Sequence, residues 1–419
     1  MLLMVKTITV LLFAVATLFS NAQEATVEKQ IASYMIPFEQ VDQASFEAIA
    51  QRIGDSEIVI LGESGHGDGK TYEVKAELVQ YLMKEKGFNT LAIEGEGFID
   101  LELKNNAYPD LFPTADLSKW KPHWGDVVQT KGMVLNILHN ENLNWKYIGI
   151  EGYNRNVPVE DFLYAALEKV DIDATTKKQF KETYEKMNRF DEEITVEEMD
   201  FILQIITTII ESGKDETKNG FTTQALVNIK GGIEDYKYSI VLGGYEGENQ
   251  YVNIRDKRMA ENVIWHKKNN PGAKIIVWIA NFHGAKHVQN VRYREEDPTL
   301  YQNYKLFAEY LVDAFQDKVY SMAFISSSGE VKDILTTSEL HQIYTPENAL
   351  EHYLHQGNTP FGYLDFNEIK KKEPTLKQTT FTSMILGYDN KPGTWLDVFD
   401  GVFYIKTNEP LKMAEYKIW

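Results

Sequence analysis

The sequence predicts an α/β protein with a mostly parallel sheet flanked by helices, a helical insertion and a small C-terminal α+β part. Two observations predict this fold. Short, continuously apolar runs recur along the chain, and the segments between them carry apolar residues at helical spacing. Continuous apolar runs are typical of parallel strands buried on both faces, and strands that alternate with helices form such sheets.

Four strands stand out in the sequence, because each is rich in β-branched residues and ends in a glycine or a polar residue. They cover residues 58–62, 90–95, 147–152 and 274–280. The apolar side chains between them fall on one helical face over 68–86 and over 126–140. Strand, helix, strand and helix in succession indicate a parallel sheet.

Residues 156–250 show helical spacing without a convincing strand, so we assign them to a helical insertion. Its helices are predicted over 159–171, 174–189, 196–212 and 222–242, with Asp173 and Thr195 as caps and Asn219-Gly220 as a turn. The other parts are an α/β catalytic domain in two pieces, 23–155 and 251–345, and a C-terminal α+β segment, 346–419, that packs on it.

After residue 300 the sequence predicts further helices and strands. The helices cover 303–315 and 346–356, and the strands cover 318–326, 361–366, 380–386 and 401–406. The sequence alone leaves open whether the last strands complete the main sheet or form a unit of their own.

The N-terminus has the pattern of an export signal. Lys6 is the single charge in residues 1–22, and it precedes an apolar run over 7–19 and small residues at Ser20 and Ala22. This pattern fits a secretory signal peptide, and the run is shorter than the ~20 residues that span a bilayer. We expect a periplasmic or secreted protein that is not inserted in the membrane once the signal is cleaved.

Composition excludes several classes of chemistry. Lys and Arg number 43 against 62 Asp and Glu, a net charge of −19, which would repel a phosphate backbone and argues against a nucleic-acid partner. The chain has no Cys, so thiol nucleophiles, thiolate metal sites and disulfides are excluded. Its nine His and its carboxylates remain for chemistry. Composition does not determine the oligomeric state.

Polar residues gather where the four predicted strands end. They are Glu63 and His66, Glu94, Glu151, and Asn281 with His283. Ligands of open α/β sheets bind outside the carboxyl ends of the strands. A single strand-end Glu usually caps a helix, and a lone His283 fits a buried His bonded to backbone equally well. Convergence of four ends predicts a functional site, in which an imidazole beside a carboxylate has the features of a general base.

Two other kinds of site fit part of this pattern. Residues 64–71 nearly match a phosphate-binding loop, but Ser64 replaces the first Gly and Asp68 puts negative charge where phosphates would lie. His66, Glu63 and Glu94 could ligate zinc. The cationic side chains of Lys70, Lys286 and Arg255 lie nearby in the sequence pattern and would offset the role of a metal ion. We therefore expect no cofactor and do not favour a metal, although the sequence leaves open whether a metal assists.

Three segments in order resemble the signatures of the erythromycin esterase family. They are Gly62-Glu63-Ser64-Gly65-His66-Gly67 with the strand ending at Glu94, then Arg255-Asp256-Lys257-Arg258-Met259-Ala260-Glu261-Asn262, then Val277-Trp278-Ile279-Ala280-Asn281-Phe282-His283. The resemblance implies hydrolysis of an ester, in known members the lactone of a macrolide, by water and without metal.

The resemblance also implies roles for individual residues. His66 would be the general base, Glu63 and Glu94 would position and polarise it, and Arg255 and His283 would bind the carbonyl side and stabilise the oxyanion. Departures from the family pattern include Gly65 for Thr, Gly95-Glu96 for Ala-Asp, Lys75 for Arg and Glu151 for Asp. Four residues are expected to bind substrate, namely Lys75, Glu151, Trp124 and Tyr153, although an aromatic residue taken singly is more often part of the core.

The function predicted from sequence is an exported hydrolase that opens the lactone ester of a macrolide or of a similar cyclic ester. Its partner would be a small-molecule ester. The alternative from another class is a non-catalytic periplasmic binding protein for a bulky glycoside or lipid. A nucleotide binder that uses residues 64–71 is the third and weakest hypothesis.

Overall fold

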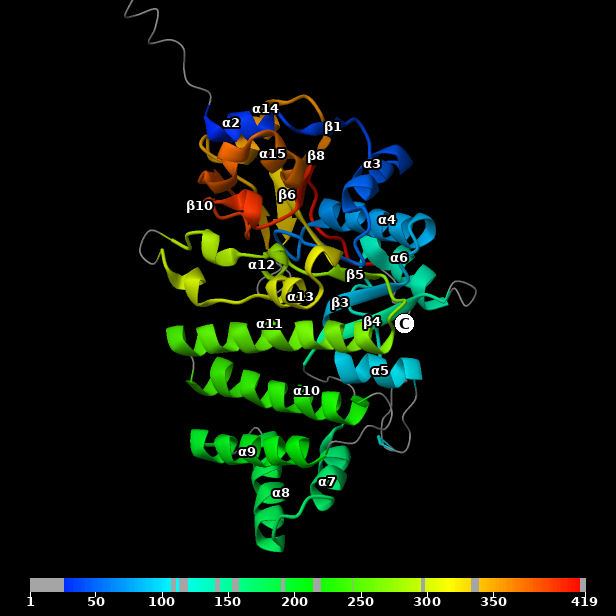
Figure 1. Ribbon diagram of the computed structural model, residues 1–419, viewed down its shortest axis with the longest axis vertical. Helices are drawn as coiled ribbons and strands as arrows, with labels where there is room; N and C mark the ends of the chain where they lie inside the picture. The colour runs from blue at the N-terminus through cyan, green and yellow to red at the C-terminus, as the bar shows by residue number, and fades with distance from the viewer. Residues whose placement is uncertain are drawn as a thin grey trace, which may run out of the picture.

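The computed structural model describes residues 26–106, 111–112, 120–139, 144–152, 158–189, 193–213, 220–242, 244–294, 298–332 and 339–414. A nine-stranded sheet in the order β1-β8-β11-β6-β2-β5-β3-β4, with β7 on β6, forms the centre of the described chain (Figure 1). The strands from β11 to β4 run parallel, whereas β1, β7 and β8 run antiparallel to their neighbours. The predicted mostly parallel sheet is confirmed.

The predicted strands lie close to their expected positions, and two further strands of the main sheet, at residues 36–38 and 340–342, were not predicted. The strands of this sheet are β1 Ile36–Phe38, β2 Ile58–Leu61, β3 Thr90–Gly97, β4 Lys146–Glu151, β5 Ile275–Trp278, β6 Val319–Lys332, β7 Leu340–Gln342, β8 Phe361–Asp365 and β11 Gly401–Asn408. All four residues of β2 and of β5 are buried, as expected of parallel strands covered on both faces.

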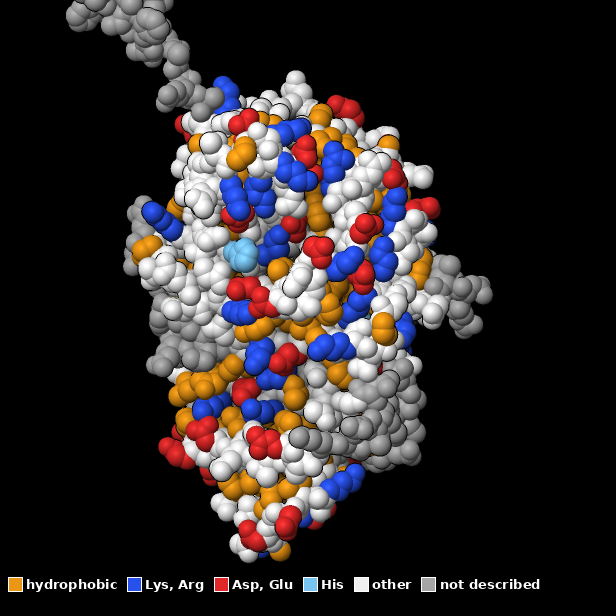
Figure 2. Space-filling view, viewed as in Figure 1, with side chains coloured by type: hydrophobic (Ala, Val, Ile, Leu, Met, Phe, Trp, Pro, Cys, Tyr) orange, Lys and Arg blue, Asp and Glu red, His pale blue; other side chains and the backbone are white. Residues whose placement is uncertain are grey.

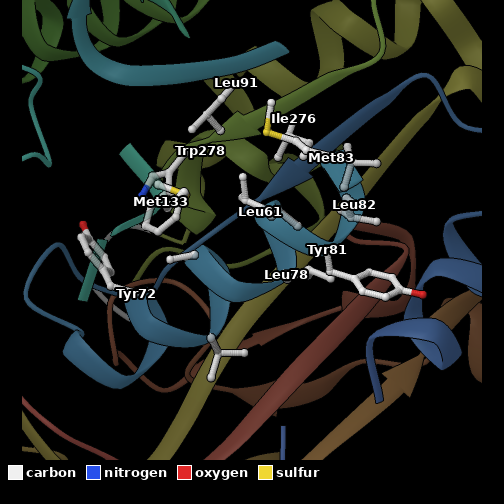
Figure 3. Close-up of a cluster of buried hydrophobic side chains, with 14 of the residues drawn as sticks. Leu61, Tyr72, Leu78, Tyr81, Leu82, Met83, Leu91, Met133, Ile276 and Trp278 are labelled. Carbon is white, nitrogen blue, oxygen red and sulfur yellow. The ribbon is translucent and has the colours of Figure 1, made fainter. Parts of the chain in front are cut away.

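Helices cover both faces of the sheet. One face is covered by α3 Gln43–Ile53, α4 Gly69–Glu85 and α6 Val128–His139, and the other by α11 Gly244–Asn269 and α13 Phe307–Phe315. Successive residues of β2 point to opposite faces, so Leu61 packs under α4 while Ile60 packs under α11 and α13. Figure 3 shows Leu78 and Leu82 of α4 in the first of these cores.

The described residues of the predicted insertion form helices and short turns, and these helices stack on the side of α11 away from the sheet (Figure 1). The insertion comprises α7 Glu160–Glu168, α8 Ala174–Asn188, α9 Val196–Ser212, α10 Phe221–Tyr236 and a π-helical turn over Lys237–Leu242, and it packs with α5 Phe98–Asn106 in a core of its own. Asp173 caps α8, and Thr195 forms a capping box with Glu198. The predicted boundary at residue 250 lies inside α11, because no proline interrupts that helix.

The C-terminal segment completes the main sheet. Its strands β8 and β11 pair directly with β1 and β6, so the segment is part of the central sheet and does not merely pack on it. A separate two-stranded sheet is formed by β9 Phe381–Ser383 and β10 Lys391–Gly393. The remaining short helices are α2 Val27–Ala32, α12 Asn281–Gly284, α14 Leu350–Gln356 and α15 Phe366–Lys372, with 3-10 turns at Val288–Asn290, Leu300–Asn303, Gln316–Lys318, Pro374–Gln378 and Trp395–Asp397.

The surface in Figure 2 carries acidic and basic side chains interspersed across the face shown. Among the described residues, no helix combines the length and the apolar character needed to cross a bilayer. The predicted signal peptide, residues 1–22, lies outside the described residues, as does Tyr153.

Candidate active site

The carboxyl ends of four neighbouring strands bring the predicted polar residues together. In the sheet these strands stand in the order β2, β5, β3 and β4. The loop after β2 supplies Glu63 and His66, β3 supplies Glu94, β4 ends at Glu151, and β5 is followed by α12 with His283. Arg255 reaches the same place from α11, which Asn262 ties to β4 by donating a hydrogen bond to the Ile150 carbonyl at 2.8 Å.

His66 is held by a buried carboxylate. Its Nδ1 lies 3.2 Å from Oε1 of Glu63, and the ammonium of Lys75 bonds to the other carboxylate oxygen. Lys75 also lies 4.0 Å from the centroid of the Trp278 ring, a cation–π contact. The pairing fixes the orientation of His66 and directs its Nε2 away from Glu63.

The charges around His66 favour its cationic form. Burial disfavours a charged imidazole, but the hydrogen bond to Glu63 and the nearby charge of Glu94 outweigh it and raise the pKa of His66 to about 9. His66 is therefore mostly protonated at neutral pH.

Arg255 connects three site residues. Its Nη2 donates to Glu94 at 2.9 Å, its Nε and Nη2 donate to the two oxygens of Glu151 at 3.2 and 2.5 Å, and its Nη1 lies 3.0 Å from Nε2 of His283. A guanidinium has five N–H groups, two of them on Nη1, so Nη1 can donate to a substrate oxygen. Burial opposes ionisation of Glu94, yet His283 and Arg255 hold its pKa well below the usual range.

His283 is oriented by Asp256, a residue to which the sequence analysis assigned no role. Both oxygens of Asp256 lie 2.9 Å from Nδ1 of His283, and one of them accepts a hydrogen bond from the Phe307 amide at 2.7 Å. Burial lowers the pKa of His283, but Asp256 and Glu94 raise it above the ordinary value overall. The signal in the sequence was the position of Asp256 next to Arg255 in the second signature.

Exposure separates residues that can meet a substrate from those that support them. The side chains of His66, Arg255 and His283 are 27%, 18% and 11% exposed. Those of Glu63, Lys75 and Glu151 are at most 1% exposed. Lys75 and Glu151 were expected to bind substrate. The structure places them behind Glu63 and Arg255, because a buried charge needs an opposite charge as its partner.

The rings of Tyr72, Trp124 and His123 pack next to one another beside His66 and form an aromatic wall. The Trp124 ring lies 6.4 Å from the His66 ring and meets the Tyr72 ring edge-on at 4.9 Å, and it is largely buried. Trp124, expected to bind substrate, is therefore mainly a packing residue of this wall. His123, which no sequence pattern marks, belongs to the same wall, with its ring 4.3 Å from that of Trp124.

The end of β3 accommodates His123. Gly95 has a positive φ of +87°, and a Cβ there would come within 2.7 Å of Nε2 of His123. Glu96 accepts hydrogen bonds from the backbone amide of His123 and from Nε1 of Trp120. Three successive residues of β3 therefore serve the site, since Glu94 binds Arg255, Gly95 leaves room for His123, and Glu96 anchors the wall.

Asn281 has a structural role at the end of β5. Its Nδ2 donates to the carbonyls of Phe324 and Ile385, each at 2.8 Å, and its backbone amide donates to the Glu63 carbonyl at 2.8 Å. A Cβ on Gly62 would collide with the Asn281 side chain. This close approach fixes the loop that carries Glu63 and His66.

The phosphate-loop hypothesis for residues 64–71 is wrong. The backbone amide of Lys70 donates to the Glu409 carbonyl, and the amide of Leu411 donates to the Gly67 carbonyl. Cβ atoms on Gly67 or Gly69 would collide with the backbones of Lys332 and Pro410. Backbone of the C-terminal segment thus occupies the space that a phosphate would need.

The carboxylates that might have held zinc are engaged by cationic side chains. Glu63 bonds to Lys75 and His66, and Glu94 bonds to Arg255. Within the described ranges, no group of three His, Asp or Glu side chains has the arrangement of a metal site.

The family model described as erythromycin esterase matches residues 135–407, about two thirds of the chain. The chain is 23% identical over 392 residues to YbfO of Bacillus subtilis (strain 168), which is named as a hydrolase, and the match covers 84% of each protein.

Solved structures show the same fold. A Bacillus cereus protein superposes with a TM-score of 0.69 at 17% identity, covering 93% of this chain and all of that one. A succinoglycan biosynthesis protein gives 0.67 at 16% identity over 92% and 98% of the two chains. A mutant of erythromycin esterase EreC in its open conformation gives 0.61 at 13% identity over 90% and 96%. The match over most of the chain and the shared architecture together show that this chain belongs to the erythromycin esterase family.

Proposed function

We propose that this protein is an exported ester hydrolase that opens the lactone of a macrolide, or of a similar cyclic ester, by attack of a water molecule activated by His66. Membership of the erythromycin esterase family and similarity to a protein named as a hydrolase support hydrolysis as the reaction class. The observation that carries the proposal is the pairing of His66 with the buried Glu63, beside the Arg255–His283 cluster at adjacent strand ends.

The chemistry follows from which atoms remain available. Neutral His66 takes a proton from water at Nε2, while the water oxygen forms a bond to the ester carbonyl carbon. The negative charge that develops on the carbonyl oxygen is stabilised by an Nη1–H of Arg255 and by the Nε2–H of cationic His283. The C–O bond to the alkoxide then breaks, and cationic His66 returns the proton to the leaving oxygen. A carboxylic acid and an alcohol result, and the acid then loses its proton to solvent as a carboxylate.

Glu63 and Glu94 support different halves of this reaction. Glu63 fixes the ring of His66 and stabilises the imidazolium formed when water is deprotonated. Glu94 aligns Arg255 and accepts a hydrogen bond from the Ala280 amide at 2.8 Å, so it links the arginine to the end of β5. Lys75 and Glu151 neutralise the charges of Glu63 and Arg255 inside the protein.

The test is incubation of the mature protein with erythromycin and with a panel of simpler cyclic esters, with and without EDTA, followed by mass spectrometry. A product heavier by one water, insensitive to EDTA and abolished in His66→Gln, is expected. Ligand-induced thermal stabilisation without turnover of any ester would instead favour the binding-protein alternative. N-terminal sequencing of exported protein tests the signal peptide, since cleavage before Gln23 is expected.

A further inference from the structure

A polar cavity lies at the opposite end of the sheet from the candidate active site. Its volume is about 300 Å³, and it forms where β3, β4 and β5 begin and where α11 ends. The polar side chains in its wall are Asn89, Thr90, Asn144, Lys146, His266 and Asn270. Its volume is at the lower end of the range for small-molecule sites.

The wall of this cavity carries positive charge in an acidic protein. The chain has a net charge of −19, yet no Asp or Glu is among the lining residues. Nζ of Lys146 donates to Oδ1 of Asn270 at 3.2 Å, and no carboxylate of the described residues lies within ion-pair distance of it. A cation without a protein counter-ion in a cavity attracts an anion.

Asn270 holds Lys146 against the end of α11. Its backbone amide and its Nδ2 both donate to the His266 carbonyl, at 2.9 and 3.0 Å. Its own carbonyl accepts a hydrogen bond from the Ala273 amide at 2.9 Å. The turn that closes the cavity therefore fixes the position of Lys146 relative to His266.

Two further side chains in the wall retain hydrogen-bonding capacity. His266 is 3% exposed, and neither of its ring nitrogens forms a hydrogen bond within the described chain; Nδ1 lies 3.8 Å from Oε1 of the buried Glu102. Asn89 uses Oδ1 to accept from Thr90 and from the Lys274 amide. Buried polar groups in folded proteins are rarely left unpaired, so His266 indicates a partner in this cavity.

We propose that this cavity binds a small oxyanion, a carboxylate or a phosphate group. Lys146 would be its counter-ion, and the ring of His266 and the side-chain amide of Asn89 would donate hydrogen bonds to it. Charge-assisted hydrogen bonds from an ammonium to such oxygens are among the strong ones in proteins. The site lies at the amino ends of strands whose carboxyl ends form the candidate active site, so it does not depend on the proposed hydrolysis.

Isothermal titration calorimetry of the full chain with sodium phosphate and, separately, with sodium acetate tests the site, in a buffer free of both anions and at constant ionic strength. Saturable binding of at least one anion is expected, with a matching rise in Tm. Lys146→Gln and His266→Gln should each weaken binding at least tenfold. Lys268→Gln, which removes an exposed charge two residues from His266 on the same helix, should not.

The outcomes separate clearly. Binding of phosphate alone identifies a tetrahedral oxyanion as the ligand, and binding of acetate alone identifies a carboxylate. The proposal is overturned if neither anion binds saturably. It is also overturned if Lys268→Gln weakens binding as much as Lys146→Gln and His266→Gln do. Asn270→Ala provides a second variant if Lys146→Gln fails to fold, because it removes the hydrogen bond that holds Lys146 without removing charge.

Discussion

Both carboxylate oxygens of Asp256 lie 2.9 Å from Nδ1 of His283, although the two residues belong to different elements, α11 and α12. Asp256 is fully buried and has a second donor in the Phe307 amide. Its charge fixes which nitrogen of His283 faces Arg255 and Glu94. Asp256 is therefore a positioning residue for His283.

Asp256→Asn is expected to lower kcat by roughly 10² with a small change in KM, because the amide cannot stabilise a cationic His283 while the developing oxyanion needs that charge. Steady-state kinetics on the ester found active in the mass-spectrometric test measure this effect. Lys257→Gln, an exposed neighbour on the same helix, is the control. A variant as active as the wild type, with its melting temperature intact, would exclude the role given to Asp256.

The rate should rise with pH through the neutral range. The pKa of His66 is raised to about 9, so kcat/KM is expected to increase up to about that pH as the neutral base becomes populated. Glu63→Gln removes the carboxylate that is hydrogen-bonded to His66, so the pKa of His66 should fall. The rising part of the pH–rate profile should then shift to lower pH, and the maximal rate should decrease. Glu73→Gln, an exposed acid on α4, is the matched control. A flat profile from pH 6 to 9 would contradict His66 as the base.

The same pKa predicts the pH dependence of stability. A group with a raised folded-state pKa stabilises the folded protein fully below its unfolded value of about 6.5, and this contribution is lost as pH rises through the folded value. The free energy of unfolding should therefore fall between about pH 6.5 and about pH 9 in the wild type. The part due to His66 should be missing in His66→Gln, and urea titrations at several pH values measure the difference. Identical pH dependence in both proteins would contradict the raised pKa.

Lys75→Met should destabilise the protein strongly. It leaves the buried Glu63 without its ammonium partner, and loss of one member of a buried pair costs about 3–5 kcal/mol. His66 still offsets part of the charge, so the lower end of that range is expected. Urea denaturation gives the value. The double variant Glu63→Gln with Lys75→Met removes both charges and should be more stable than Lys75→Met alone; the opposite order would refute the pairing.

Gly95 and His123 should be energetically coupled. Gly95→Ala introduces a Cβ within 2.7 Å of the imidazole, and the positive φ adds strain of about 1 kcal/mol. In the background of His123→Ala the collision disappears, whereas the strain remains. A double-mutant cycle of unfolding free energies should give a coupling of roughly 0.5–3 kcal/mol, and strictly additive effects would show that the two residues do not meet.

Much of the fold could be predicted from the sequence, because hydrophobic period and turn residues are local signals. The apolar runs at 58–62 and 274–280 became β2 and β5, and Thr195 capped α9 as expected. The strand-end pattern also located Glu63, His66, Glu94 and His283, since parallel strands deliver their carboxyl ends to one edge. Arg255 came from the resemblance to the family, because its position on α11 is unrelated to any strand end.

Tertiary structure decided which residues are partners and which are exposed. The expectation that Lys75 and Glu151 bind substrate followed from their positions in the family pattern, but both side chains are buried and serve as counter-ions of other site residues. The pairing of Asp256 with His283, and the entry of β8 and β11 into the main sheet, depend on contacts between segments far apart in the chain. The sequence by itself determined the helices and strands and the edge of the sheet that carries the candidate active-site residues. The packed structure determined the charge of each group, since a pKa depends on neighbours that no local pattern specifies.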